Sequence, residues 1–204
     1  MSDKKKVLLF LDTATKELEA GVLFGKEKKC LDLGSAKSAL ERTNLGIGEL
    51  LSSCGLALKD VTDFYCLLGP GSNTGIRLGL TIPRTIYGID PTISCFGIET
   101  LKLFLAGEKD GYAALSDRRG NLYLGVVENG NYRYEKVDKT RVKESIPSGT
   151  KVVVEKKDLE AKATLKDYPF EEIDVLERMI DKKEEFEDFS KSIDTYLPRY
   201  IQAI

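Results

Sequence analysis

The chain has 204 residues, of which 42% are hydrophobic and 31% are charged, so it is long enough to bury the core of one domain or two small lobes. Lys and Arg (31) nearly balance Asp and Glu (33), and the formal net charge of -2 argues against direct binding of an RNA backbone. There is no histidine, which excludes Ser-His-Asp and Cys-His catalysis and histidine-ligated metals.

Other features of the composition point to a cytoplasmic protein. No apolar run approaches the roughly 20 residues that span a bilayer, and the apolar stretch at 7–11 is too short for a signal peptide. The cysteines form no CxxC motif and stand in apolar surroundings, so we expect reduced, buried thiols at Cys30, Cys54, Cys66 and Cys95. With no histidine and no clustered cysteines, we expect neither a metal site nor a cofactor.

The first half of the chain alternates predicted strands and helices. Apolar runs predict strands at 7–12, 18–24, 28–33, 63–68 and 92–95. Helical spacing predicts helices at 38–54, from Ser72 onward and at 98–106, with Ser72 as the N-cap of the second and Gly55 ending the first.

The second half repeats this order. Strands are predicted at 111–115, 121–128, 132–137 and 151–154, with Asn129-Gly130 as a hairpin turn, and a charged helix at 170–190. We expect the charged stretch 182–188 to form a solvated helix face. A strand with an acidic end, two hairpin strands, a helix and a strand thus occur twice, which predicts two related α/β lobes. We expect an N-terminal lobe at 1–105 and a smaller C-terminal lobe at 106–204, the outline of the actin-like ATPase (ASKHA) fold.

The first predicted strand ends on Asp12-Thr13-Ala14-Thr15. In actin-like kinases this turn binds phosphate, and a glycine usually lets its N–H groups approach the anion. Ala14 and Thr15 stand here instead, so Asp12, Thr13 and Thr15 are candidates only for a vestigial phosphate loop. The alternative is a polar strand end that makes local turn bonds.

The stretch GPGSNTGIRLGL at 69–80 carries the strongest signal. Gly75 and Gly79 lie on one face of the predicted helix, and Pro83 follows four residues later. Glycine costs a helix about 1 kcal/mol relative to alanine, so a bare face favours close contact with another helix. We expect that helix to belong to another chain. A phosphate cradle at the helix N-terminus is the alternative, although the stretch lacks the lysine of a P-loop.

Two further segments leave alternatives open. The predicted helix at 38–54 contains Gly46 and Gly48, and it is either a second partner surface or packed internally. The stretch SDRRGNLY at 116–123 opens the second lobe with two arginines where a phosphate loop would have glycines. These arginines either bind an anion, or the turn is simply held by Asp117.

Taken together, these segments resemble the bacterial TsaB (YeaZ-type) family. The likeness rests on the opening strand with its Asp12 turn, on 69–80 and on 116–123, and weakly on LPRYIQ at 197–202. The sequence departs from the family pattern at Asn73, where phenylalanine is usual, at Pro83, at Gln202, and at the first long helix, which lacks a His-Ser start.

The resemblance implies a two-lobed actin-like fold and a non-catalytic role. TsaB pairs with its larger paralogue TsaD, which holds the metal and the catalytic site. Together with a small TsaE-like ATPase, the complex forms N6-threonylcarbamoyladenosine at position 37 of tRNAs that read ANN codons. We therefore expect this chain to contact tRNA only through the complex, with a homodimer through the same surface as an alternative. The residues assigned to that surface are Leu45, Gly46, Leu50, Asn73, Gly75, Arg77, Leu78, Gly79 and Ile82.

Other functions are weaker alternatives. A free-standing actin-fold kinase or nucleotide hydrolase would need two phosphate loops, and both candidate loops lack the glycines. A degenerate peptidase would need metal ligands that the sequence does not offer. A diverged paralogue with an interaction role alone is the remaining alternative.

Overall fold

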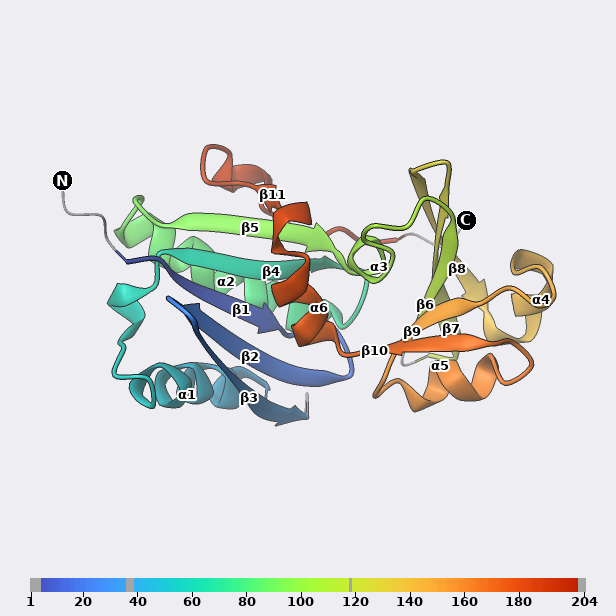
Figure 1. The fold of residues 1–204 in the computed structure, drawn as a ribbon, viewed down its shortest axis with the longest axis horizontal. Helices are drawn as coiled ribbons and strands as arrows, with labels where there is room; N and C mark the ends of the chain where they lie inside the picture. Colours follow the sequence, from blue (N-terminus) through green and yellow to red (C-terminus); the bar gives the residue numbers. More distant parts are fainter. Residues whose placement is uncertain (1–4, 36–38, 118, 202–204) are drawn as a thin grey trace.

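The computed structural model describes residues 5–35, 39–117 and 119–201, which form two mixed β-sheets with helices packed on their faces (Figure 1). The first sheet has the strand order β11-β5-β4-β1-β2-β3. Its strands are β1 (Val7–Asp12), β2 (Glu17–Phe24), β3 (Glu27–Ser35), β4 (Asp63–Gly69), β5 (Ser94–Glu99) and β11 (Glu187–Asp188). β1 is antiparallel to β2 and parallel to β4, so the turn after β1 lies beside the turn after β4.

The second sheet repeats this arrangement in the order β10-β9-β6-β7-β8. Its strands are β6 (Gly111–Ser116), β7 (Asn121–Glu128), β8 (Asn131–Asp138), β9 (Val152–Glu155) and β10 (Phe170–Ile173). β6 pairs antiparallel with β7 and parallel with β9, as β1 pairs with β2 and β4. The predicted repetition of one α/β unit is confirmed by this matching strand order.

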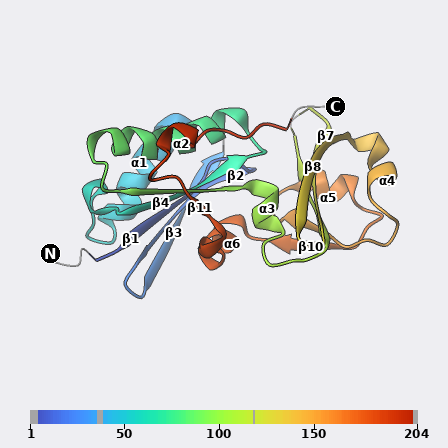
Figure 2. The same ribbon diagram turned by 90° about the horizontal axis from the view of Figure 1, so that it is seen from above.

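Helices cover both sheets (Figure 2). α1 (Ala39–Ser52) and α2 (Asn73–Ile89) lie on one face of the first sheet, and α6 (Val175–Asp181) lies on the other. α3 (Thr100–Phe104) packs between the sheets, while α4 (Val142–Ser145) and α5 (Leu159–Thr164) pack on the second sheet. Short 3-10 turns occur at Leu58–Asp60, Lys139–Arg141, Lys183–Glu185 and Ile193–Thr195. Among the described residues, no helix has the length and apolar character needed to cross a membrane.

The hydrophobic core joins the two sheets. Alternate residues of β6 face opposite sides, because successive side chains of a strand point to opposite faces. Ala113 and Leu115 belong to the large core that fills the first sheet, whereas Ala114 belongs to a smaller core under α4 and α5. Leu101 and Phe104 of α3 are fully buried in the large core. The second sheet therefore packs through α3 onto the core of the first.

The predicted helix at 170–190 is wrong in its extent. Phe170–Ile173 forms β10, which pairs parallel with β9. Asp174 then begins α6, its side chain accepting a hydrogen bond from the Glu177 backbone N–H at 3.0 Å. The charged stretch 182–188 is not a helix face, because a 3-10 turn leads into β11. Only Ile173 of β10 is buried and the other three side chains are exposed or partly exposed, so its sequence lacks the apolar run of a buried strand.

The chain returns to the first sheet after β10. β11 pairs antiparallel with β5, and the Tyr196 ring is fully buried against Phe189. The Tyr196 hydroxyl donates a hydrogen bond to the Phe96 carbonyl at 2.9 Å. The division into domains at residue 105 stays a prediction. In the strand order, β11 from the last part of the described chain completes the first sheet.

The cysteine prediction is right for two residues and wrong for one. All four thiols are free, and Cys66 and Cys95 are buried in the first sheet. Cys30 is exposed, because it lies on the edge strand β3 among charged residues. Cys54 is half-buried at the end of α1.

Candidate functional site

A cleft of about 370 Å³ lies where the turns after β1 and β6 meet the N-terminus of α2. Its lining is mostly polar, and Tyr200 and Ile201 contribute to it. Its lining includes Ala14, Thr15, Lys16, Gly71, Ser72, Asn73, Thr74, Leu115, Ser116, Asp117, Arg119, Tyr123, Lys136, Tyr200 and Ile201. The two turns proposed from the sequence as phosphate loops are thus brought together at one cleft.

The turn after β1 is closed by its own carboxylate. Asp12 accepts hydrogen bonds from the backbone N–H groups of Ala14 at 3.0 Å and Thr15 at 3.1 Å, and from the Thr15 hydroxyl. Burial raises the pKa of Asp12 to about 6, against the opposing effect of these hydrogen bonds. The local turn bonds expected from a polar strand end are therefore present. They occupy the N–H groups that a phosphate would need.

The glycines of α2 pack against this same turn. A Cβ atom on Gly75 would lie 1.7 Å from the Thr13 carbonyl oxygen, and one on Gly79 would lie 2.4 Å from the Thr13 hydroxyl. The Thr13 hydroxyl donates a hydrogen bond to the Gly75 carbonyl at 2.7 Å. A Cβ atom on Gly71 would lie 2.3 Å from the Ala14 carbonyl oxygen. The same carbonyl accepts a hydrogen bond from the Ser72 N–H at 2.7 Å. The prediction that Gly75 and Gly79 face a helix of another chain is wrong, because their bare face meets Thr13 in the turn after β1 of the same chain.

Ser72 is the N-cap of α2, as predicted. Its side chain accepts a hydrogen bond from the Gly75 N–H at 3.3 Å. Asn73 and Thr74 follow at the cleft and are exposed. The helix therefore begins at the cleft, although its first turn is anchored to the β1 turn.

The turn after β6 is closed in the same way. Asp117 accepts hydrogen bonds from the backbone N–H groups of Arg119 at 2.7 Å and Asn121 at 2.8 Å, and forms an ion pair with Lys136 at 2.7 Å. Burial opposes ionisation of Asp117, but the hydrogen bonds from Lys136, Asn121 and Arg119 outweigh it and lower the pKa well below its ordinary value. Asp117 thus holds its turn, which was one of the two sequence-based alternatives. Arg118 lies outside the described residues.

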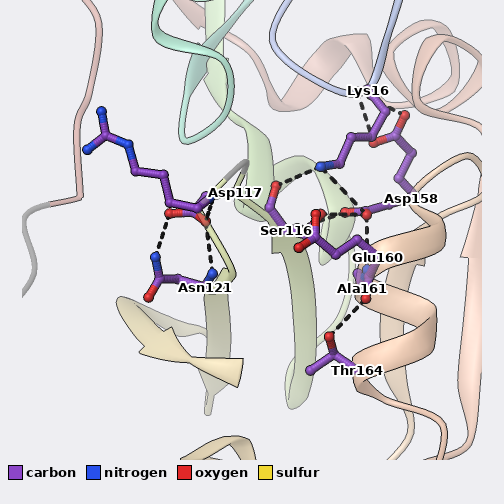
Figure 3. A network of polar contacts seen from close by, with 10 residues as sticks. Lys16, Ser116, Asp117, Asn121, Asp158, Glu160, Ala161 and Thr164 are labelled. Atoms are coloured by element: carbon purple, nitrogen blue, oxygen red, sulfur yellow. Dashed lines mark hydrogen bonds and ion pairs between the residues drawn. The ribbon is translucent and has the colours of Figure 1, made fainter. Parts of the chain in front are cut away.

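Two buried acidic residues, Glu155 at the end of β9 and Asp158 before α5, lie close to Lys16 in the β1 turn, and Figure 3 shows Asp158 beside Lys16. Glu155 ends β9, and both of its oxygens lie 3.3 Å from the Lys16 backbone nitrogen. Asp158 accepts hydrogen bonds from the Ser116 N–H at 2.7 Å and from the Ala161 N–H at 3.0 Å. Burial, then repulsion by Asp12 and Asp158, raises the pKa of Glu155 to about 8.

Sequence reasoning missed Glu155, Asp158 and Lys16. Glu155 follows three consecutive valines, so the rule that singled out Asp12 and Asp117, an acidic residue ending an apolar strand, applies to it as well. Asp158 begins α5 as its N-cap, a position that aspartate favours. Lys16 carries no comparable signal.

The residues assigned to a partner surface divide into two groups. Gly46, Leu50, Gly75, Leu78 and Gly79 are buried inside the chain. A Cβ atom on Gly46 would lie 2.2 Å from the Leu33 side chain. These five are corrections, because the apolar face of each helix packs on the first sheet. The other four, Leu45, Asn73, Arg77 and Ile82, lie at least partly on the surface.

Arg77 is not free on that surface. Its Nε atom donates a hydrogen bond to the Tyr200 hydroxyl at 2.8 Å, and its guanidinium carbon lies 5.8 Å from the centre of that ring. Leu45, in contrast, is 68% exposed at the middle of α1. Gly48, one turn further on, has no described atom from outside its own stretch of helix within 4 Å of where its Cβ would be. Among the described residues, Leu45 and Gly48 therefore mark an open face of α1 within the predicted surface.

We expect the isolated chain to hydrolyse no ATP and to bind it weakly at most. Asp12 and Asp117 each direct a negative charge at the backbone N–H groups that would hold phosphate. The measurement is calorimetric titration with ATP in the presence and absence of magnesium. Tight, magnesium-dependent binding contradicts this expectation and favours the kinase alternative.

No protein-family model matches the chain. The chain is 31% identical over 96 residues to the tRNA threonylcarbamoyladenosine biosynthesis protein TsaB of Bacillus subtilis (strain 168), which covers 45% of this chain and 41% of that protein. It is 28% identical over 125 residues to TsaB of Haemophilus influenzae (strain Rd), covering 59% of this chain and 53% of that protein. The chain thus matches about half the length of these curated relatives.

Two solved structures show the likeness in fold. YeaZ from Pseudomonas aeruginosa superimposes with a TM-score of 0.68 over 96% of this chain and 100% of that chain, at 17% identity. AlfA from the Bacillus subtilis plasmid pLS32, in its filament structure, gives a TM-score of 0.53 over 87% and 99%, at 8% identity. The predicted actin-like ATPase fold is confirmed.

Proposed function

Because this chain is a homologue of the TsaB (YeaZ-type) family, we propose that it is the non-catalytic partner subunit of a complex that forms N6-threonylcarbamoyladenosine at position 37 of tRNAs reading ANN codons. The observation that carries the non-catalytic part is the closure of both strand-end turns by Asp12 and Asp117. The chain has no histidine, the residue type with which the TsaD family holds its catalytic metal. In this proposal the catalytic subunit is a TsaD-like paralogue.

The open faces of α1 and α2 form the proposed partner surface. Both helices lie on one face of the first sheet (Figure 2). Leu45 is 68% exposed and Ile89 is 82% exposed, and Ile82 lies half-buried on α2. Large exposed aliphatic side chains on neighbouring elements are the kind of surface that another chain buries. Gly48 leaves space beside Leu45 for a helix of that chain to approach.

The remaining partners follow from the same family. A TsaE-like ATPase would supply nucleotide hydrolysis, because Asp12 and Asp117 occupy N–H groups of both candidate phosphate loops in the described part of this chain. The near balance of charges, at a net -2, supports contact with tRNA only through the other subunits. A homodimer through α1 and α2 is the alternative use of the same surface.

Replacing Leu45 with aspartate is expected to weaken the complex by tenfold or more, because a charge at the core of an apolar interface commonly costs over about 2 kcal/mol. The measurement is co-purification with the TsaD-like protein of the same organism, followed by a calorimetric affinity. The matched control is Leu159→Asp, since Leu159 is 73% exposed on α5 of the second sheet. Equal retention of both variants contradicts the surface, and the absence of any complex with the unmodified chain contradicts the proposed function.

A further inference from the structure

Lys16 connects the two sheets across the cleft (Figure 3). It lies in the turn between β1 and β2, and its Nζ atom donates a hydrogen bond to the Ser116 carbonyl, at the end of β6, at 3.1 Å. The same atom lies 3.8 Å from Asp158. The Lys16 backbone nitrogen lies 3.3 Å from both oxygens of Glu155. One residue of the first sheet therefore contacts three elements of the second.

The acceptors that Lys16 meets are already fixed in place. Asp158 is completely buried and accepts hydrogen bonds from the N–H and the hydroxyl of Ser116, at 2.7 and 2.6 Å. It also caps α5 through the Ala161 N–H. Lys16 is 24% exposed, so its ion pair with Asp158 is less screened than a surface pair. Because these acceptors are already ordered, less conformational entropy is lost when Lys16 contacts them.

A second link runs in the opposite direction. Lys157, between β9 and α5, places its Nζ atom 2.9 Å from Glu19 of β2. Each sheet thus contributes a lysine to a carboxylate of the other. Lys136, by contrast, pairs with Asp117 within the second sheet and its turn, although it lines the same cleft.

We propose that Lys16 is an internal latch that holds the two sheets together across the cleft. A nucleotide in this cleft would bridge the turns after β1 and β6, and here the lysine itself makes that bridge. The two sheets then keep one relative position, and the proposed partner surface on α1 and α2 belongs to this rigid unit. This inference is independent of the identity of the partner.

The test measures the distance between the two sheets by electron paramagnetic resonance. Spin labels are placed on Cys30, which is exposed on β3, and on Ser148→Cys, an exposed turn of the second sheet, in a Cys54→Ser background. Cys66 and Cys95 are buried. We expect a single narrow distance distribution that ATP does not change. Lys16→Met is expected to increase the width of this distance distribution about twofold, because loss of the contact lets the two sheets move relative to each other.

Lys136→Met is the matched control, since it removes a lysine from the same cleft without breaking a link between the sheets. We expect its distribution to remain that of the parent. Lys16→Arg is expected to keep the narrow distribution, and Lys16→Gln provides the same comparison if Lys16→Met does not fold, as judged by circular dichroism. An unchanged distribution in the folded variant that lacks the lysine, or equal broadening in Lys136→Met, overturns the latch.

Discussion

Replacing Gly75 with alanine is expected to destabilise the isolated chain by about 3 kcal/mol, at the upper end of what overpacking usually costs. The added Cβ atom would lie 1.7 Å from the Thr13 carbonyl oxygen, which belongs to the backbone of β1 and its turn. Relief of that contact moves α2 away from the sheet and breaks the Thr13–Gly75 hydrogen bond. The measurement is denaturant unfolding of the purified variant.

Gly88→Ala is the control for this effect, because Gly88 is exposed on the same helix and no described atom from outside its own stretch of helix lies within 4 Å of its Cβ position. We expect Gly88→Ala to be neutral or to stabilise the chain by up to about 1 kcal/mol, the gain in helix propensity. Gly79→Ala should lie between the two, since the Thr13 hydroxyl that it meets can move by side-chain rotation. Equal unfolding free energies for Gly75→Ala and Gly88→Ala would show that α2 does not pack on the β1 turn.

The free energy of unfolding is expected to fall as the pH rises toward about 8, and Glu155→Gln should remove much of that fall. The folded-state pKa of Glu155 is about 8, above the 4.5 of the unfolded chain, so its stabilising contribution is full below 4.5 and is lost as the pH rises to 8. Burial among Asp12 and Asp158 causes the shift, while the Lys16 N–H and Thr15 hydroxyl oppose it. Between about pH 6.5 and pH 8 the loss is on the order of 2 kcal/mol.

Between these two pH values the change in stability reports mainly on Glu155 and not on the other carboxyl groups with shifted pKa values. Asp12, with a pKa of about 6, contributes with the same sign but mainly at lower pH, and Asp117 acts only in acid because its pKa is lowered. The measurement is denaturant unfolding at both pH values. Glu144→Gln is the control, since Glu144 is exposed and its pKa is lowered. If Glu155→Gln and the unmodified chain lose stability equally across the window, Glu155 is not held protonated.

The strands and the repeated topology were predictable because their signals are local. An apolar run and the Asn129-Gly130 turn each involve only neighbouring residues, and Ser72 caps a helix that starts beside it. The strand β10 was not predictable, because its exposed side chains resemble those of the charged helix that follows.

The candidate site was harder to predict, since it depends on contacts between distant residues. A bare glycine face indicates close packing, but the sequence does not say against which chain. The answer depends on Thr13, which is 62 residues from Gly75. Lys16 likewise meets Ser116 across 100 residues, and no spacing rule connects a turn lysine to a carbonyl that far away. The acidic residues Asp12 and Asp117 at strand ends were identified from the sequence, whereas the side chains that surround them were not.

The return of the chain to β5 has a consequence for folding during synthesis. The first sheet receives β11 and the buried ring of Tyr196 only when almost the whole described chain has left the ribosome. The second sheet, in contrast, is complete once β10 has emerged, and its strands are consecutive in the sequence. Contacts between distant segments form slowly because loop closure must come first. The half of the molecule that is made first is therefore finished last, and β5 lacks β11 along its edge and the Tyr196 ring beside Gly97 until then.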